Sequence, residues 1–121
     1  MVQLVAVTDS TQLYELNQLH QVQAEHAYVC LEQKQIKAVL FYTIQKQKGM
    51  ILKITTQDED MLDGLVRICF ARLLDMGIQQ AEFSSDMDVH LLEKLGFVHD
   101  GSFCVYSLSE IINNCRKCKK N

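Results

Sequence analysis

The chain has 121 residues, of which 48% are hydrophobic, and its formal net charge is -3. This size and composition suit one globular domain whose core needs no disulfide bonds. The negative charge argues against binding to a nucleic-acid backbone, although Lys117, Lys119 and Lys120 form a small basic tail. No apolar run approaches the roughly 20 residues that span a bilayer, and the N-terminus lacks a secretory signal pattern. We therefore expect a cytoplasmic protein that binds neither nucleic acid nor membrane.

Residues 2–7 alternate loosely between apolar and polar and predict a first strand. Asp9 and Gln12 then have the spacing of a capping box, which predicts a helix start. The helix that follows places four apolar residues on one face: Leu13, Leu16, Leu19 and Val22. A helix of this kind covers one face of a sheet.

The next segment predicts three strands joined by short turns. β-branched and aromatic residues dominate 27–31 and 36–44, and the polar stretch 32–35 between them predicts a hairpin turn. Lys48-Gly49 predicts a second turn, and 50–55 a third strand. Short connections of this length imply antiparallel pairing.

The clearest helix follows this meander. Gly77 can end it, and 81–84 then predicts a short strand, so that strand, helix and strand form a right-handed parallel crossover. One broad apolar face of the helix comprises Met61, Leu62, Leu65, Val66, Cys69, Phe70, Leu73 and Leu74.

A short last helix and a long strand complete the pattern. Ser85 or Asp86 can cap a helix that ends at Gly96, where glycine takes the left-handed conformation that closes a helix. Phe97 begins the next apolar stretch, and 98–108 predicts one long strand, bulged at Gly101.

The run Leu91-Leu92-Glu93-Lys94-Leu95-Gly96-Phe97 resembles the C-terminal half of the GCN5-related N-acetyltransferase fold, whose members often read LYEKLGF here. The order of elements matches as well. The resemblance implies a mixed α/β fold with a mixed, mostly antiparallel sheet and helices on both faces. No repeat, low-complexity stretch or linker is visible, so we expect a single domain over 1–110 and a tail over 111–121. The chain has room for about one helix between its first two strands, where the family usually has two, so acceptor specificity does not carry over.

In that family a loop of pattern Q/R-x-x-G-x-G/A receives the coenzyme A pyrophosphate on backbone amides at the start of the long helix. The corresponding run here reads QDEDMLDG. Aligning the helices places Gln57 at the first motif position, with Asp60 and Leu62 where the glycines are expected. A register shifted by two keeps Gly64 but puts Glu59 and Leu62 at the other positions. The loop is degenerate in both registers.

Four carboxylates lie in or just before the first turn of this helix: Asp58, Glu59, Asp60 and Asp63. Acids there stabilise the helix by roughly 0.3–1 kcal/mol each. They also repel a pyrophosphate, by about 1–4 kcal/mol per pair of charges at roughly 4 Å. One alternative is that the acids merely cap and solubilise the helix, and the other is that the loop still binds phosphate. The first alternative is favoured.

The resemblance implies that acetyl-CoA, if it binds, lies between the fourth and fifth strands near Ile54, Thr55 and Ser85. The family's proton-donating tyrosine corresponds to Leu92, which cannot donate a proton. Tyr42 and Tyr106 could substitute only if they face the cleft, and core packing is the simpler role for them. The catalytic residues are therefore unknown.

The five cysteines add little chemistry. Cys30, Cys69 and Cys104 lie in apolar, periodic segments and are expected to be reduced thiols in the core. Cys115 and Cys118 form a single CxxC pair, which predicts an exposed tail, with intermolecular metal or disulfide contact as the alternative. The four histidines lack metal-ligand spacing, so no metal site is expected.

Two functions follow from this sequence. The first is a divergent acyl-CoA-dependent N-acetyltransferase with a degenerate pyrophosphate loop and an unknown amine acceptor. The second is a non-catalytic relative that uses the fold to bind a protein or a small ligand. An unrelated small α/β domain is a third reading, since the LLEKLGF-like run is short. The exposed edge of the predicted sheet would also allow a homodimer.

Overall fold

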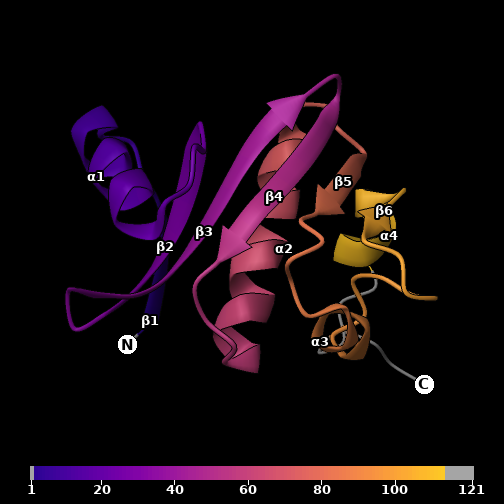
Figure 1. The fold of residues 1–121 in the computed structure, drawn as a ribbon. Coiled ribbons are helices and arrows are strands. Elements are labelled where there is room, and N and C mark those ends of the chain that lie inside the picture. Colours follow the sequence, from indigo (N-terminus) through magenta and orange to yellow (C-terminus); the bar gives the residue numbers. More distant parts are fainter. Residues whose placement is uncertain (1, 114–121) are drawn as a thin grey trace.

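The structure is a computed structural model that describes residues 2–113. Its strands form one sheet in the order β1-β2-β3-β4-β5-β6 (Figure 1). Neighbouring strands are antiparallel, except that β4 and β5 are parallel, which confirms the mixed, mostly antiparallel sheet. The strands are β1 (Val2–Ala6), β2 (His26–Glu32), β3 (Gln35–Gln45), β4 (Lys48–Ile54), β5 (Gln80–Phe83) and β6 (Cys104–Val105).

The helices cover both faces of this sheet, as predicted. Helix α1 (Ser10–His20) packs on one face through Leu16. Helix α2 (Glu59–Asp75) crosses the other face and lies behind β3 and β4 in Figure 1. The short helices α3 (Val89–Lys94) and α4 (Leu108–Asn113) join α2 in the same hydrophobic cluster.

Alternating side chains of β2 and β3 belong to two separate hydrophobic clusters, because successive residues of a strand point to opposite faces. The smaller cluster lies under α1, and the residues of these strands that belong to it are Ala27, Val29, Val39 and Phe41. The larger cluster, under α2, takes Tyr28, Cys30, Ala38, Leu40 and Tyr42. Phe70, Phe83 and Phe97 meet within it at ring-centroid distances of 5.9 to 6.3 Å. The main core therefore lies on the α2 side.

The parallel pair β4–β5 separates before β4 ends. Pairing joins 48–51 to 80–83, and the next hydrogen bond runs from the Ser84 amide to the Ile51 carbonyl oxygen at 2.9 Å. Residues 52–54 of β4 have no register partner on the β5 side within the described part of the chain. The carboxyl ends of the two strands thus part, and such a crevice is where open sheets with parallel strands place their ligands.

The turn before β4 lies two residues earlier than predicted. Lys46 and Gln47 form it, with φ of 51° and 65°, the left-handed values that a two-residue hairpin loop requires. Lys48 and Gly49 already belong to β4. Gly49 is needed for packing instead, because a Cβ there would collide with the Cδ1 of Leu73. A packing glycine was thus mistaken for a turn glycine.

The prediction of one long strand over 98–108 is wrong. Only Cys104 and Val105 pair with β5. Asp100 and Gly101, with φ of 58° and 72°, form a turn that interrupts the apolar stretch. Phe97 is buried in a loop, where a strand had been expected to begin. The apolar composition of this segment reflects burial in the loop and not strand pairing.

The segment after this strand folds as helix α4 up to Asn113. Ile111 and Ile112, which fall in the predicted tail, pack against the main core. The Cys115-Cys118 pair lies outside the described residues.

Two details of the predicted helices are also wrong. Leu19 does not share the buried face of α1, since 73% of its surface is exposed. Helix α3 is capped by Asp88, whose carboxylate accepts from the amides of His90 and Leu91, and not by Ser85 or Asp86. The cap of α1 is Asp9, as predicted, and it accepts from the Thr11 amide.

Candidate functional site

A cleft of about 640 Å³ lies where β4 and β5 part. Its walls come from the end of β4, the start of α2, helix α3 with the loop before it, and the loop after α1. Apolar side chains make up much of its lining, among them Val22, Ile54, Leu62, Met87, Leu91 and Leu92. Polar side chains also reach it, among them Gln21, Lys53, Gln57, Asp86 and Asp88. The cleft suits an extended, partly apolar ligand with polar ends.

A β-bulge shapes the strand that forms the back of this cleft. In the β3–β4 ladder Ile51 lies opposite Tyr42 and Lys53 opposite Phe41, which leaves Leu52 as the extra residue. A bulge bends its strand and redirects nearby side chains, and bulges are common beside active sites. Leu52 lines the cleft.

Thr55 fixes the direction in which the chain leaves β4. Its amide donates to the Val39 carbonyl oxygen at 2.9 Å, and its Oγ1 accepts from the Val39 amide at 2.9 Å. These two bonds continue the contact with β3 by one residue beyond the end of β4. Thr55 itself does not line the cleft.

The start of α2 is occupied by its own cap. The Asp58 carboxylate accepts from the Met61 amide at 3.0 Å, and the Asp58 amide donates to the Thr56 hydroxyl oxygen at 3.0 Å. Helix amides at this position are the groups that would bind an anion. Here the Asp58 carboxylate already accepts the hydrogen bond of the Met61 amide.

The other acids of this turn differ in their partners. Glu59 pairs with Lys94 of α3 at 2.7 Å, and Asp63 pairs with Arg67 at 3.1 Å. Asp60 forms no ion pair with any residue in 2–113. The negative charge left without a cationic partner at the start of α2 is therefore that of Asp58 and Asp60.

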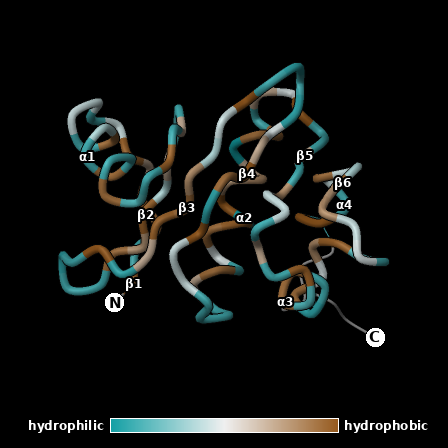
Figure 2. The backbone as a smooth tube through the Cα atoms, viewed as in Figure 1, coloured by the Kyte–Doolittle hydropathy of each residue, from teal (hydrophilic) through white to brown (hydrophobic). Residues whose placement is uncertain are grey.

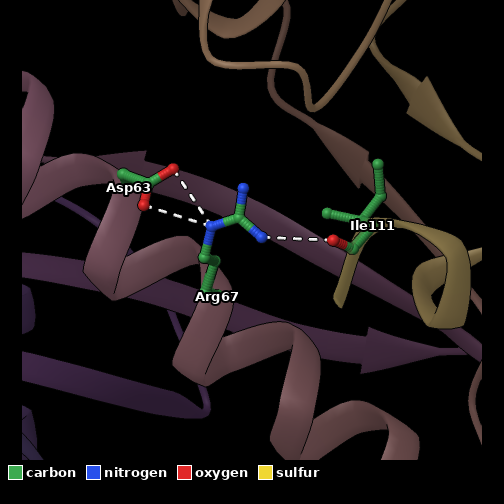
Figure 3. A network of polar contacts seen from close by, with 3 residues as sticks. All are labelled: Asp63, Arg67 and Ile111. Atoms are coloured by element: carbon green, nitrogen blue, oxygen red, sulfur yellow. Dashed lines mark hydrogen bonds and ion pairs between the residues drawn. The ribbon is translucent and has the colours of Figure 1, made fainter. Parts of the chain in front are cut away.

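Arg67 joins α2 to the C-terminal part of the fold (Figure 3). Its Nε lies 3.2 and 3.1 Å from the two carboxylate oxygens of Asp63, and its terminal nitrogen donates to the Ile111 carbonyl oxygen at 3.1 Å. The guanidinium carbon also lies 5.4 Å from the ring centroid of Phe97. These contacts are structural, because Arg67 does not line the cleft.

The structure brings three of the six predicted binding residues into the cleft lining: Ile54, Gln57 and Leu62. The other three, Thr55, Asp60 and Ser85, do not line it, although Ser85 is next to Asp86, which does. Whether any of them binds a ligand stays a prediction.

The residues considered as proton donors are arranged unfavourably for that role. Leu92 lines the cleft with 1% of its surface exposed, so the position that corresponds to the family's tyrosine is apolar. Tyr42 is buried and stacks on His26 at 5.0 Å and on Tyr28 at 6.1 Å, and burial raises the pKa of its hydroxyl. Tyr106 is 71% exposed and does not line the cleft.

Sequence reasoning missed the charged and polar groups at the rim. Lys53 is at the end of β4, and its ammonium donates to the His20 carbonyl oxygen at 3.2 Å. Asp86 and Asp88 lie between β5 and α3. The only sequence signal for these residues is that Asp88 comes just before the apolar stripe of α3. That position indicates a helix cap and not a binding site.

Residues 2–113 contain three free thiols. Cys30 and Cys69 are buried free thiols and Cys104 is half-buried; burial raises the pKa of Cys30 and of Cys69. Within residues 2–113, no group of three or more His, Cys, Asp or Glu side chains is arranged to hold a metal ion. The same part of the chain contains no helix that is long and apolar enough to cross a membrane.

Comparison with solved structures identifies the fold. An IAA acetyltransferase from Bacillus cereus ATCC 14579 matches with a TM-score of 0.60 and 19% identity, over 81% of this chain and 77% of that chain. The ribosomal-protein-S18-alanine N-acetyltransferase from Escherichia coli matches with a TM-score of 0.60 and 14% identity, over 81% of this chain and 78% of that chain. A Bacillus subtilis acetyltransferase in complex with CoA matches with a TM-score of 0.60 and 17% identity, over 81% of this chain and 77% of that chain.

Sequence comparison gives no further information, since no family model and no curated protein matches the chain. The structural likeness and the element order agree with each other. The chain therefore has the fold of the GCN5-related N-acetyltransferases, in a divergent form.

Proposed function

We propose that this domain binds an acyl-CoA-type thioester between β4 and β5 and acts as a divergent N-acetyltransferase with a degenerate pyrophosphate loop. The observation that carries the proposal is the cleft of about 640 Å³ at the point where the two strands part. Acetyl-CoA, when bound, would supply the acetyl group, which an acceptor amine takes by attacking the thioester carbonyl. A C–N bond forms, the C–S bond breaks and CoA leaves as the thiolate, which takes up a proton from solvent while the amine gives up its proton to solvent.

The chain's own residues would hold the donor mainly through its apolar arm. Leu62, Leu91 and Leu92 form an apolar wall from α2 and α3, which suits a pantetheine chain and keeps water from the thioester. The end of β4 pairs with β3 and not with β5, and Thr55 continues the contact with β3 through its bonds to Val39. These features support donor binding without requiring the pyrophosphate loop.

The phosphate end of such a donor would be held weakly. A pyrophosphate at the start of α2 would have to displace the Asp58 carboxylate from the Met61 amide and would approach the unpaired Asp60. Repulsion between unit charges at about 4 Å costs roughly 1–4 kcal/mol in water to near-surface surroundings. Each 1.4 kcal/mol is tenfold in affinity, so the nucleotide portion would contribute little or oppose binding.

A second candidate function is a non-catalytic binding domain for a protein segment or a small ligand. Two observations favour it: the Asp58 carboxylate already caps the helix, and Leu92 replaces the proton-donating tyrosine. The same cleft would then bind a neutral or cationic ligand that needs no phosphate contacts.

Titration calorimetry with two donors separates these functions. The native chain and the variant Asp58→Asn are each titrated with acetyl-CoA and with S-acetylpantetheine, which lacks the nucleotide. Asparagine caps a helix as well as aspartate does, so this variant loses only charge. We expect Asp58→Asn to bind acetyl-CoA about tenfold more tightly than the native chain. Binding of S-acetylpantetheine should not change.

The matched control is Asp9→Asn, which makes the same change at the cap of α1. It should alter the affinity for neither donor. If the native chain and Asp58→Asn both give no heat with either donor up to millimolar concentration, the cleft does not bind a thioester. If both donors bind but no free thiol is released in the presence of a panel of primary amines, the non-catalytic function is correct.

A further inference from the structure

One lysine borders the cleft that is proposed above to bind the thioester. Lys53 is in β4, two residues beyond Ile51, the last residue of β4 that pairs with β5, and it follows the bulge residue Leu52. Its neighbours Leu52 and Ile54 line the cleft with it. Within residues 2–113, Lys53 is the only cationic residue of this lining. A primary amine is therefore present in the cleft of the proposed acyl donor.

The Lys53 ammonium has a single contact that is easily exchanged. Its hydrogen bond within residues 2–113 runs to the His20 carbonyl oxygen, at 3.2 Å and in an exposed position at the end of α1. In the same part of the chain Lys53 forms no ion pair, whereas Lys48 and Lys94 each pair with a glutamate. Water can replace one exposed hydrogen bond, and the four-carbon stem of lysine is flexible. The amine can thus turn into the cleft that its own side chain borders.

An amine that is attached to the cleft needs no separate binding step to reach a bound thioester. Attachment replaces encounter in solution by an effective concentration of about millimolar or more. In its neutral form a lysine amine is a nucleophile toward carbonyl groups. By contrast, one exposed ammonium attracts a ligand carboxylate only weakly, so Lys53 would be a poor anchor for an acidic substrate. The position of Lys53 therefore suits an acceptor better than a binding group.

We propose that Lys53 is itself an acetyl acceptor, so that the domain acetylates its own Lys53 Nζ from a thioester bound in the cleft. This inference rests on the proposed function, because the donor must bind between β4 and β5. The neutral Nζ attacks the thioester carbonyl, a C–N bond forms and the C–S bond breaks. The thiol leaves as a thiolate that takes up a proton from solvent, while the nitrogen gives up a proton to solvent. Acetylation removes the positive charge of Lys53 and leaves the carboxylates of Asp86 and Asp88 in the lining.

Mass spectrometry of the acetylated chain tests this assignment. The folded full chain is incubated with S-acetylpantetheine, and peptide mapping follows the acetyl occupancy of each lysine with time. Lys34 and Lys46 are exposed in hairpin turns outside the cleft, and they report uncatalysed acetylation in the same sample. We expect Lys53 to react at least about tenfold faster than either of them. In guanidinium chloride all three should react equally fast, because the unfolded chain has no cleft.

A lysine-to-arginine variant gives a second readout. Lys53→Arg keeps the charge and can still donate to the His20 carbonyl oxygen, but it has no primary amine. It should abolish most of the free thiol that the native chain releases without any added amine. The matched control Lys34→Arg should leave this release unchanged.

Two outcomes overturn the inference and separate it from the proposed function. If the folded chain binds S-acetylpantetheine in calorimetry but Lys53 reacts no faster than the two turn lysines, Lys53 only tethers β4 to α1 and the proposed donor site stands. If neither acetyl-CoA nor S-acetylpantetheine binds, both the inference and the proposed function are wrong.

Discussion

Helices α1 and α2 cover opposite faces of one sheet, yet they are held in different ways. Helix α2 has 17 residues and buries six of them: Leu62, Leu65, Val66, Cys69, Phe70 and Leu73. Helix α1 has 11 residues and buries only Leu16. In Figure 2 the tube of α1 is mostly teal and white, whereas brown stretches follow α2 and the inner strands. The sheet therefore has one strongly and one weakly covered face.

This difference extends to the cleft, because the start of α2 and the loop that follows α1 form two of its walls. Leu62 comes from α2 and belongs to the main core. On the other side the loop after α1 contributes Gln21 and Val22. That loop is held by Asn17, whose side-chain amide donates to the Ala24 carbonyl oxygen at 2.9 Å while its oxygen accepts from the Ala24 amide at 3.1 Å. One wall thus belongs to the main core, whereas the other is held by hydrogen bonds to α1 and by packing of Val22 and Ala24 on the smaller cluster.

The largest expected effect comes from shortening one buried leucine on each helix. Leu65→Ala should lower the free energy of unfolding by about 3–5 kcal/mol, because Leu65 is fully buried in the main core. Leu16→Ala should cost about 1–2 kcal/mol, since its neighbours in the smaller cluster can move into the space. Urea unfolding followed by circular dichroism measures both. Equal losses would mean that α1 is as firmly packed as α2.

A smaller effect is expected from the loop wall. Asn17→Ala removes both bonds to Ala24 and should cost about 1–2 kcal/mol. It should also speed hydrogen exchange of the Ala24 amide at least tenfold, with no change at amides of α2. Gln18→Ala, at an exposed neighbouring position of the same helix, is the matched control and should do neither. Unchanged exchange at Ala24 would show that burial and not Asn17 holds the loop.

The effect that is smallest near neutral pH is a pH dependence of stability on the α2 face, which grows only above about pH 9. Burial raises the pKa of both Cys69 and Tyr42 in the folded protein. The unfolded chain therefore loses these protons first as pH rises, so their stabilising contribution is complete below the ordinary pKa values, near 8.5 and 10, and is lost above them. Each group should lower stability by up to about 1.4 kcal/mol per pH unit in that range.

Urea unfolding at pH 7, 8, 9 and 10 checks this sign. Cys69→Val keeps most of the packing. In this variant the free energy of unfolding should fall less steeply with pH at the lower end of the range, where Cys69 would otherwise contribute. The free energy of unfolding should be almost level between pH 7 and 8. A stability that rises between pH 8 and 10 would contradict the assignment of both groups as neutral when buried.

The sequence predicted those parts of the fold that depend on local patterns. The apolar face of α2 and the hairpin of β2 and β3 were correct because their periodicity reports which side is buried. The segment after Phe97 was wrong because burial in a loop and pairing in a strand give similar apolar composition. Gly49 was misplaced because its contact with Leu73 lies far along the chain.

The cleft was less accessible to sequence reasoning. Ile54, Gln57 and Leu62 were selected by resemblance to a family, and all three line it. Its position depends on where the β4–β5 pairing ends, after Ile51, which no local pattern indicates. The polar groups that line it come from the end of β4 and from three separate loops, so only the tertiary fold brings them together.

The bond between Arg67 and the Ile111 carbonyl oxygen also has a practical consequence. A version of this protein trimmed after Glu110 would lose that acceptor, together with the apolar contacts of Ile111 and Ile112. In that trimmed protein the Arg67 guanidinium would keep only its contacts with Asp63 and with the ring of Phe97. Deletions and affinity tags at this end are therefore best placed beyond Asn113, so that the final turn of α4 stays anchored to α2.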